Sequence, residues 1–282
     1  MGSKTVRRWL PVTALTVAAA ASLRRVRYDQ TTKKRIEDLL SAAKPTSKLT
    51  YQREDVEHLP EPVRRYFEAV LEDGQPRVRA ARLSQRGEFR FGGRSGSWKP
   101  LRATQYYTVD PPGFVWDADI EVLPFVSVRV VDAYERGRGS LRAMLLSAFS
   151  VANAPPGEAM NEGELLRYLA EAVWFPTALL PGEHVEWEPI DEYAARATIE
   201  DRGNTASLVF HFDDDGLVRR VSAAARYRQE DDSLERWTGY FSEYEWHDGI
   251  RIPTEASVEW TLPSGDMPYW RASIESVGYR QR

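Results

Sequence analysis

The sequence predicts a mainly β fold: a curved antiparallel sheet or half-barrel with a helix in its concave face, preceded by N-terminal helices. Three observations lead to this prediction. Apolar and polar residues alternate through seven short segments between Val185 and Val277, a second alternating region runs from Arg82 to Leu146, and residues 161–173 show helical spacing between the two. Alternation with a period of two is typical of antiparallel strands that have one buried and one solvated face.

The alternating segments are bounded by recognisable turns. Stretches rich in Asp, Asn, Gly and Ser separate the seven late segments, for example at 201–204, 213–216 and 264–266, and such residues are typical of hairpin turns. The earlier region is expected to form one strand that ends at the glycine-rich turn 92–96, followed by strands near 97–108, 114–121, 126–134 and 139–146.

Two helices are expected within the β domain. The first begins near Pro62, since proline suits the first turn of a helix, and it ends at Asp73-Gly74. The second covers residues 161–173, where Asn161 is expected to be the N-cap and Glu164 its capping-box partner. This second helix has a wide apolar face, which favours packing against the sheet.

Composition excludes several classes of site and partner. The chain has 282 residues, no cysteine and a net charge of −4. The absence of cysteine excludes disulfides, thiolate zinc sites, cysteine nucleophiles and lipidation on an N-terminal cysteine. Basic residues are spread along the chain, whereas a nucleic-acid groove needs a concentrated basic patch. We therefore expect no nucleic-acid partner.

The N-terminus combines a basic start with an apolar stretch from Trp9 to Leu23. These are parts of a secretory signal, with cleavage near Ala21. Arginines follow directly at positions 24, 25 and 27, and positive charge there opposes translocation of that flank. The stretch is also short for a membrane span, which needs about 20 residues of helix. Three interpretations therefore stay open: an uncleaved membrane anchor, a cleaved signal peptide and an amphiphilic arm.

These patterns predict a domain organisation and a location. Residues 1–27 are expected to be a signal anchor or signal peptide, residues 28–54 a polar stalk with a short helix near Thr32–Ala43, and residues 55–282 a single mainly-β domain. We expect the protein to be membrane-anchored or exported, at the cell envelope, with the membrane side left open.

No stretch has a recognisable catalytic, metal or cofactor signature. The four histidines, His58, His184, His211 and His247, do not pair at a metal-ligand spacing. Asp117 and Asp119 lie on one side of a predicted strand, where an exposed strand face is a simpler explanation than an acid–base pair. The serine nucleophile elbow is absent, and the glycines of 92–96 precede no helix. We therefore expect no catalytic residues, no metal and no cofactor.

Small residues recur midway along the late strands, on the face expected to be buried, while Trp and Phe cluster toward the strand ends. Interior packing density requires that something fill the space above them. The 161–173 helix is the simpler candidate to fill this space, and an apolar ligand is the alternative. Both could occupy it if the helix packs imperfectly against the sheet. The residues expected to line a ligand site are Phe210, Ala223, Ala225, Trp237, Phe241, Ala256, Trp260 and Trp270.

Aromatic residues also concentrate on both faces of the last three predicted strands. Trp237 and Phe241 share one face, and Tyr240, Tyr244 and Trp246 share the other. This distribution is consistent with one face in the core and the other against a protein partner, a membrane surface or the first β region. It is also consistent with the preference of aromatic residues for strands.

Four segments, 160–176, 212–218, 237–241 and 250–253, resemble an uncharacterised bacterial and archaeal family whose members often have an N-terminal apolar segment. The resemblance covers about Val56 to Tyr279. It implies no activity, so no site residues are transferred from it.

At the level of architecture, strands followed by a helix and a strand meander resemble the lipoprotein-carrier fold of the outer-membrane sorting proteins. That resemblance implies an open barrel with helices in its mouth that holds acyl chains. A shared fold does not establish a shared function.

The leading hypothesis from the sequence is a non-enzymatic, membrane-tethered or exported domain that binds a lipid or another apolar small molecule. The membrane contact would be made by the N-terminal segment. A protein-interaction or scaffold domain at the cell envelope is the second hypothesis, and an exposed apolar patch would favour it. The third is a hydrolase with an unfamiliar carboxylate site, which would need Asp117 and Asp119 to lie in a cleft with shifted pKa values.

Overall fold

The structure is a computed structural model that describes residues 6–45, 48–182, 184–228 and 230–281, with side chains in the first helix described from Ser22 onward. The strands are β1 (Ala80–Arg90), β2 (Trp98–Thr108), β3 (Gly113–Leu123), β4 (Val126–Glu135), β5 (Arg138–Leu145), β6 (Phe149–Ala154), β7 (Val185–Asp191), β8 (Ala194–Asp201), β9 (Asn204–Phe212), β10 (Val218–Arg228), β11 (Ser233–His247), β12 (Ile250–Leu262) and β13 (Gly265–Arg280). The α-helices are α1 (Val6–Ala42), α2 (Glu61–Val70) and α3 (Glu158–Glu171).

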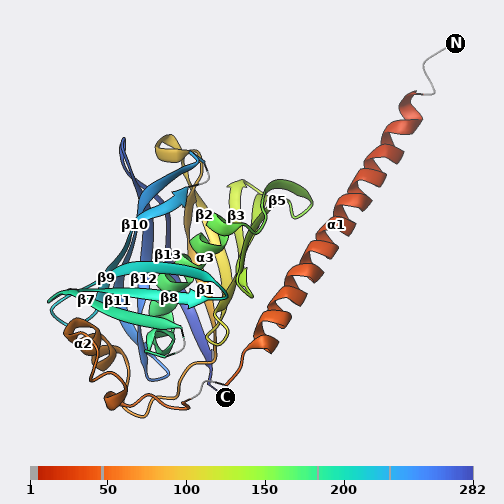
Figure 1. Ribbon diagram of the computed structural model, residues 1–282. Helices are drawn as coiled ribbons and strands as arrows, with labels where there is room; N and C mark the ends of the chain where they lie inside the picture. Colours follow the sequence, from red (N-terminus) through yellow and green to blue (C-terminus); the bar gives the residue numbers. More distant parts are fainter. Residues whose placement is uncertain (1–5, 46–47, 183, 229, 282) are drawn as a thin grey trace.

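All thirteen strands form one antiparallel sheet in the order β6-β5-β4-β3-β2-β1-β13-β12-β11-β10-β9-β8-β7. The sheet curls around α3, which lies on its concave side (Figure 1). The mainly β half-barrel with a helix in its concave face is therefore confirmed. The seven late strands β7–β13 are those expected between Val185 and Val277. β6 was not expected, because its mostly exposed residues give no buried stripe.

Antiparallel pairing places five of the turns at one end of the sheet. These are β1–β2, β3–β4, β5–β6, β10–β11 and β12–β13, and we call this end the upper end, since it lies at the top of Figure 1. The opposite end, with the turns β2–β3, β4–β5 and β9–β10, is the lower end. The described C-terminal residues also lie at the lower end, where the end of β13 pairs with the start of β1.

A bulge in β10 changes which residues face the core. The pairing with β11 shifts register between Ala223 and Arg226. An extra residue at a bulge disturbs the strict alternation of side chains, so Ala225 is exposed while Arg226 turns inward. The expected place of Ala225 on the buried face is therefore wrong.

α3 begins earlier than the sequence pattern indicated. Its N-cap is Gly157, and Asn161 lies in the first turns of the helix. The Asn161 side chain caps a different element, because its Oδ1 accepts a hydrogen bond from the backbone N–H of Gly139 at 2.8 Å. The expected capping box of Asn161 and Glu164 is therefore wrong. Leu165 and Leu169 on the other face of the helix are fully buried.

The segment after α3 closes the concave side at its lower half. Trp174 is buried and its indole N–H donates to the carbonyl of Pro253 at 3.1 Å. Trp187 of β7 likewise donates to the carbonyl of Leu179 at 2.9 Å. Helix α2 adds Tyr66 and further side chains to the same continuous core. The core is thus built from strands, α2, α3 and the short helical turns that follow α3.

Helix α1 packs on the outer, convex face of the sheet. Its Tyr28 and Leu39 join a separate buried cluster with Val115, Val131 and Met144 of β3, β4 and β5. α1 is one continuous helix, longer than the expected helix at 32–43, and its lower part rests on the sheet. From there it rises past the upper end (Figure 1). No helix among the described residues combines the length and hydropathy needed to cross a membrane.

The two ends of the curled sheet meet through side chains. Tyr134 at the end of β4 donates its hydroxyl to Asp201 Oδ2 of β8 at 2.9 Å. Asn204 Nδ2 at the start of β9 donates to the carbonyl of Gly137 at 2.9 Å and to Tyr134 Oη at 3.2 Å. We call these contacts the clasp, because they join the β8–β9 turn to the β4–β5 turn.

The position of α3 in the concave face predicts a strong effect of Leu169→Ala on stability. Leu169 is fully buried, and truncation of such a leucine leaves a cavity that costs about 2–5 kcal/mol. Urea denaturation of the full chain should show this loss. Glu162→Ala on the exposed side of α3 is the matched control and should change the stability by less than about 0.5 kcal/mol.

Candidate functional site

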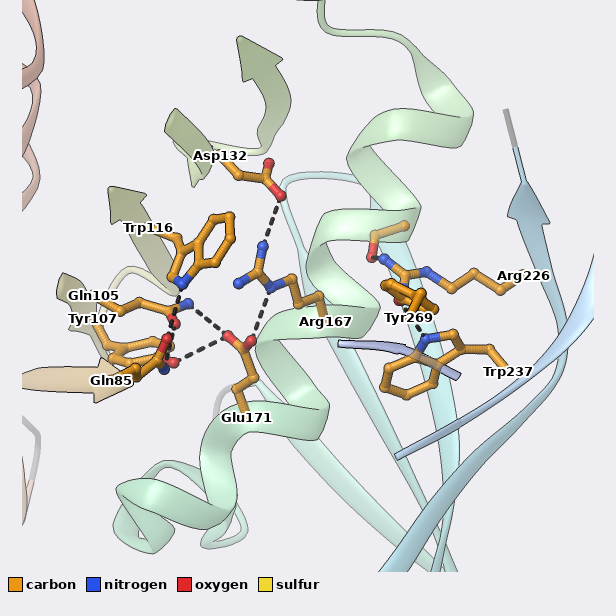
Figure 2. A network of polar contacts seen from close by, with 11 residues as sticks. Gln85, Gln105, Tyr107, Trp116, Asp132, Arg167, Glu171, Arg226, Trp237 and Tyr269 are labelled. Atoms are coloured by element: carbon orange, nitrogen blue, oxygen red, sulfur yellow. Dashed lines mark hydrogen bonds and ion pairs between the residues drawn. The ribbon is translucent and has the colours of Figure 1, made fainter. Parts of the chain in front are cut away.

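A group of polar side chains lies between α3 and strands β1–β4, on the concave side of the sheet (Figure 2). We call this group the polar cluster. It consists of Gln85, Gln105, Tyr107, Trp116, Asp132, Glu164, Arg167 and Glu171.

Arg167 is the centre of the polar cluster. Its Nη1 donates to Asp132 Oδ2 at 2.7 Å and its Nε to Glu171 Oε1 at 2.8 Å. The guanidinium also lies over the rings of Phe114 and Trp116, 4.9 and 5.0 Å from their centroids. Two carboxylates and two aromatic faces thus surround one mostly buried cation, as a buried charge requires.

A chain of hydrogen bonds extends the polar cluster across β2 and β1. Glu171 Oε2 accepts from Gln105 Nε2 at 2.7 Å and from the Tyr107 hydroxyl at 3.0 Å. Gln85 Nε2 then donates to Gln105 Oε1 at 3.2 Å, and Trp116 donates its indole N–H to Gln85 Oε1 at 2.9 Å. These contacts fix the rotamers of the polar side chains beneath α3.

Two carboxylate oxygens of the polar cluster have no hydrogen-bond partner: Asp132 Oδ1 and Glu164 Oε2, both buried. Burial, reinforced by the nearby charge of Asp132, raises the pKa of Glu164 to about 8. Burial also raises the pKa of Asp132, although Arg167 opposes that shift. The Glu164 carboxyl therefore holds its proton at neutral pH and can act as a hydrogen-bond donor.

Five aromatic side chains form a continuous wall from the upper end into the concave side. We call Phe89, Phe91, Trp237, Trp260 and Tyr269 the aromatic wall. Phe91 is partly exposed and lies 4.8 Å from Phe89, which lies 6.0 Å from Tyr269. Tyr269 in turn stacks on Trp260 at 6.1 Å and accepts the indole N–H of Trp237 at 2.9 Å.

Arg226 connects the aromatic wall to α3. Its guanidinium lies 5.1 Å from the ring centroid of Trp237 and 5.6 Å from that of Trp260. It also donates to the carbonyl of Gly163 on α3 at 3.1 Å, and Figure 2 shows it beside Trp237 and Tyr269. The concave side therefore offers an apolar wall that ends at a charged group.

The residues expected to line a ligand site are only partly brought together. Trp237 and Trp260 belong to the aromatic wall, and Trp270 is buried next to Tyr269. Phe210 and Phe241 instead pack edge-on against the chain's own Trp187 and Trp174, at 5.1 and 6.2 Å. The buried small residues among the eight are Ala223 and Ala256. A role of these residues in binding stays a prediction.

The polar cluster was not recognised from the sequence, although a signal for it exists. Glu164, Arg167 and Glu171 recur at intervals of three and four residues, which places them on one helical stripe. A charged stripe on a helix expected to lie inside a sheet indicates buried ion pairs. Partners such as Gln85 and Gln105 fall in strands where polar residues suggest a solvated face, so the sequence offers no comparable signal for them.

The two carboxylates considered as an acid–base pair, Asp117 and Asp119, lie on the outer face of the sheet. Asp117 accepts two hydrogen bonds from Arg129, each 2.7 Å long. The pKa of Asp119 is raised, mainly by burial, but this carboxylate lies outside the concave side. Within the described part of the chain, no three His, Asp or Glu residues are grouped so that they would hold a metal ion.

Large exposed apolar side chains lie in or beside the turns of the upper end. We call Phe91, Leu123, Phe125, Leu146, Phe149 and Leu234 the apolar rim. Phe125 is 100% exposed and has a φ of 64°, and Leu146, 45% exposed, has a φ of 52°. Left-handed backbone at a non-glycine residue costs about 1–3 kcal/mol, so neither stability nor solubility explains these two residues.

Comparison with known proteins identifies a family and two distant structures. A model described as a family of unknown function (DUF6544) matches residues 49–272, which confirms the resemblance to a family without known activity. A search of curated proteins found no match.

Among solved structures, a LolA superfamily protein from Nitrosomonas europaea is 13% identical, with a TM-score of 0.41 and coverage of 78% of this chain and 93% of that one. A beta-barrel-like protein with the domain of unknown function DUF1849 from Brucella abortus is 8% identical, with a TM-score of 0.23 and coverage of 72% and 99%. At these scores neither structure indicates what this chain binds.

The raised pKa of Glu164 predicts a pH-dependent effect of Glu164→Gln. The folded state retains the proton up to about pH 8, whereas the unfolded chain releases it near the ordinary value of 4.5. The wild type should therefore lose stability relative to Glu164→Gln as the pH rises from 5 to 8, by at least about 1 kcal/mol. Denaturant unfolding of both proteins across this range measures the difference. Glu162→Gln is the control, and an equal pH dependence in all three proteins would contradict the prediction.

Proposed function

We propose that this chain, which belongs to the DUF6544 family of unknown function, is a lipid-binding half-barrel that docks on a membrane with its upper end. The observation that supports this proposal most directly is the apolar rim. Its six side chains come from four hairpins, β1–β2, β3–β4, β5–β6 and β10–β11, and all lie at one end of the sheet. Soluble monomers rarely gather large apolar side chains in this way without a partner surface.

The backbone at the apolar rim strengthens the argument. Turn residues with positive φ are usually Gly, Asn or Asp, whereas here Phe125 and Leu146 take such positions and expose their side chains. The rim would regain the cost of this exposure by inserting into the acyl boundary of a bilayer, where apolar side chains of amphipathic elements are buried about 5–10 Å deep.

The direction of α1 agrees with the same orientation. The helix runs upward along the outer face and its N-terminal part passes beyond the upper end (Figure 1). The apolar stretch from Trp9 to Leu23 belongs to this part of the helix. The apolar rim and the helical segment that contains the apolar stretch therefore lie toward the same end of the molecule, so that one membrane could receive both.

The aromatic wall would receive the apolar part of the ligand. An acyl chain that enters beside Phe91 would follow Phe89 and Tyr269 to Trp260 inside the concave side, and Arg226 would meet a polar group at its inner end. The carboxylates Asp132 and Glu171 are held by Arg167, which favours a structural role for them over acid–base catalysis. We therefore propose binding without chemical turnover.

Membrane docking predicts that a probe at position 125 enters the lipid. The chain has no native cysteine, so Phe125→Cys allows one environment-sensitive fluorophore to be attached. After reconstitution of the full chain in phosphatidylcholine vesicles, its emission should shift to the blue and be quenched by brominated lipid. Asp215→Cys, exposed in the β9–β10 turn at the lower end, should give neither change. Equal quenching at both positions, or none at 125, would refute the docking.

Ligand binding along the aromatic wall predicts energy transfer from tryptophan to a bound polyene fatty acid. Transfer in the wild type should fall markedly in Trp260→Phe, because this indole lies in the wall. Trp246→Phe removes an exposed indole near the lower end of β11 and should leave the transfer unchanged. The idea fails if the wild type shows no saturable transfer or if the two variants behave alike.

A further inference from the structure

A cavity of about 350 Å³ lies on the outer face between α1 and strands β5 and β6. It is close to the upper end, since the β5–β6 turn forms part of its wall. The lining side chains are Arg24, Arg27, Tyr28, Thr31, Arg142, Met144, Ala148 and Ser150. We call this cavity the arginine pocket.

The arginine pocket has three positive charges and no acidic side chain in its lining. A second cavity under α1, of about 280 Å³, provides a contrast. Its lining includes Arg35 and Arg136 but also Asp38 and Glu135, and Arg35 pairs with Glu135. The second cavity is therefore balanced in charge, whereas the lining of the arginine pocket has a net positive charge from three exposed arginines.

The carboxylates near the arginine pocket form ion pairs with an arginine outside it. Asp29 and Asp117 both pair with Arg129, which does not line the pocket. Among the residues that the structure describes, no ion pair joins Arg24, Arg27 or Arg142 to a carboxylate. The three guanidinium groups are consequently available to an external anion.

Buried side chains hold the pocket in shape. Tyr28 is buried and donates a hydrogen bond from its hydroxyl to the backbone carbonyl of Arg142 at 3.2 Å. The Arg142 guanidinium lies over the Tyr28 ring, 5.9 Å from its centroid. Met144 and Ala148 are buried and provide an apolar floor. A lining that combines arginine side chains with a buried apolar surface suits an amphiphilic ligand, which has an anionic group and an apolar part.

We propose that the arginine pocket binds the phosphate group of an anionic lipid at the membrane surface. Guanidinium groups bind phosphate oxygens with paired, charge-assisted hydrogen bonds. The choice of a lipid as the source of the phosphate rests on the proposed docking of the upper end, which would bring the pocket to headgroup level. Basic residues at that level are attracted by anionic lipid.

The test compares the affinity of the full chain in uncharged detergent for four probes. These are short-chain phosphatidylglycerol, short-chain phosphatidylcholine, glycerol phosphate and inorganic phosphate, each followed by the rise in melting temperature that ligand binding causes. The wild type should prefer phosphatidylglycerol. Arg142→Gln should weaken that binding about fivefold, and the triple variant Arg24→Gln, Arg27→Gln, Arg142→Gln about a hundredfold, since each arginine contributes about equally at a lipid surface.

Arg236→Gln is the matched control, because Arg236 is exposed near the upper end of β11 and lies outside the pocket. Its affinity should equal that of the wild type. If glycerol phosphate and inorganic phosphate bind as well as the lipid, and the triple variant loses all three, the phosphate site stands with a soluble phosphate as its source. Equal phosphatidylglycerol affinity in the triple variant and the control overturns the site. The fluorophore at position 125 reports docking separately, so either proposal can fail alone.

Discussion

The buried guanidinium of Arg167 is the contact on which the arrangement of the concave side depends. A curved sheet of thirteen strands has an inner face that must be covered, and α3 covers it while carrying a charged stripe inward. Arg167 is neutralised partly by α3 itself, through Glu171, and partly by β4, through Asp132. Removal of one partner would leave a buried charge without compensation, which is far more costly than the loss of an exposed pair. The network therefore ties the helix to one position on the sheet.

Most of the sheet could be predicted from the sequence, because alternation and turn chemistry are local properties. The seven late strands follow directly from segments bounded by Asp- and Gly-rich turns. The register of a strand depends on its pairing partner, so local sequence patterns predict it less well. The bulge in β10 adds one residue without any Gly or Pro to mark it, and it exchanges the expected roles of Ala225 and Arg226. The alternation of apolar and polar residues does not by itself show where a bulge interrupts it.

The candidate site could be predicted only in part for a similar reason. Trp237 and Trp260 were expected on the inner face, because aromatic alternation is visible in the sequence. The partners of Arg167 come from β3, β4 and α3, and only the folded chain brings these segments together. Asn161 shows the same limit on a smaller scale, since its side chain serves the β4–β5 hairpin and not its own helix. Long-range polar contacts leave little trace in local patterns.

The clasp of Tyr134, Asp201 and Asn204 closes the circumference without continuing the backbone ladder, because β6 and β7 remain the outermost strands of the sheet. Separation of the seam would break a few side-chain hydrogen bonds, each worth about 1 kcal/mol, and would leave every strand pairing intact. At this seam the circumference is thus closed by side chains alone, and the thirteen strands keep their pairing without relying on it.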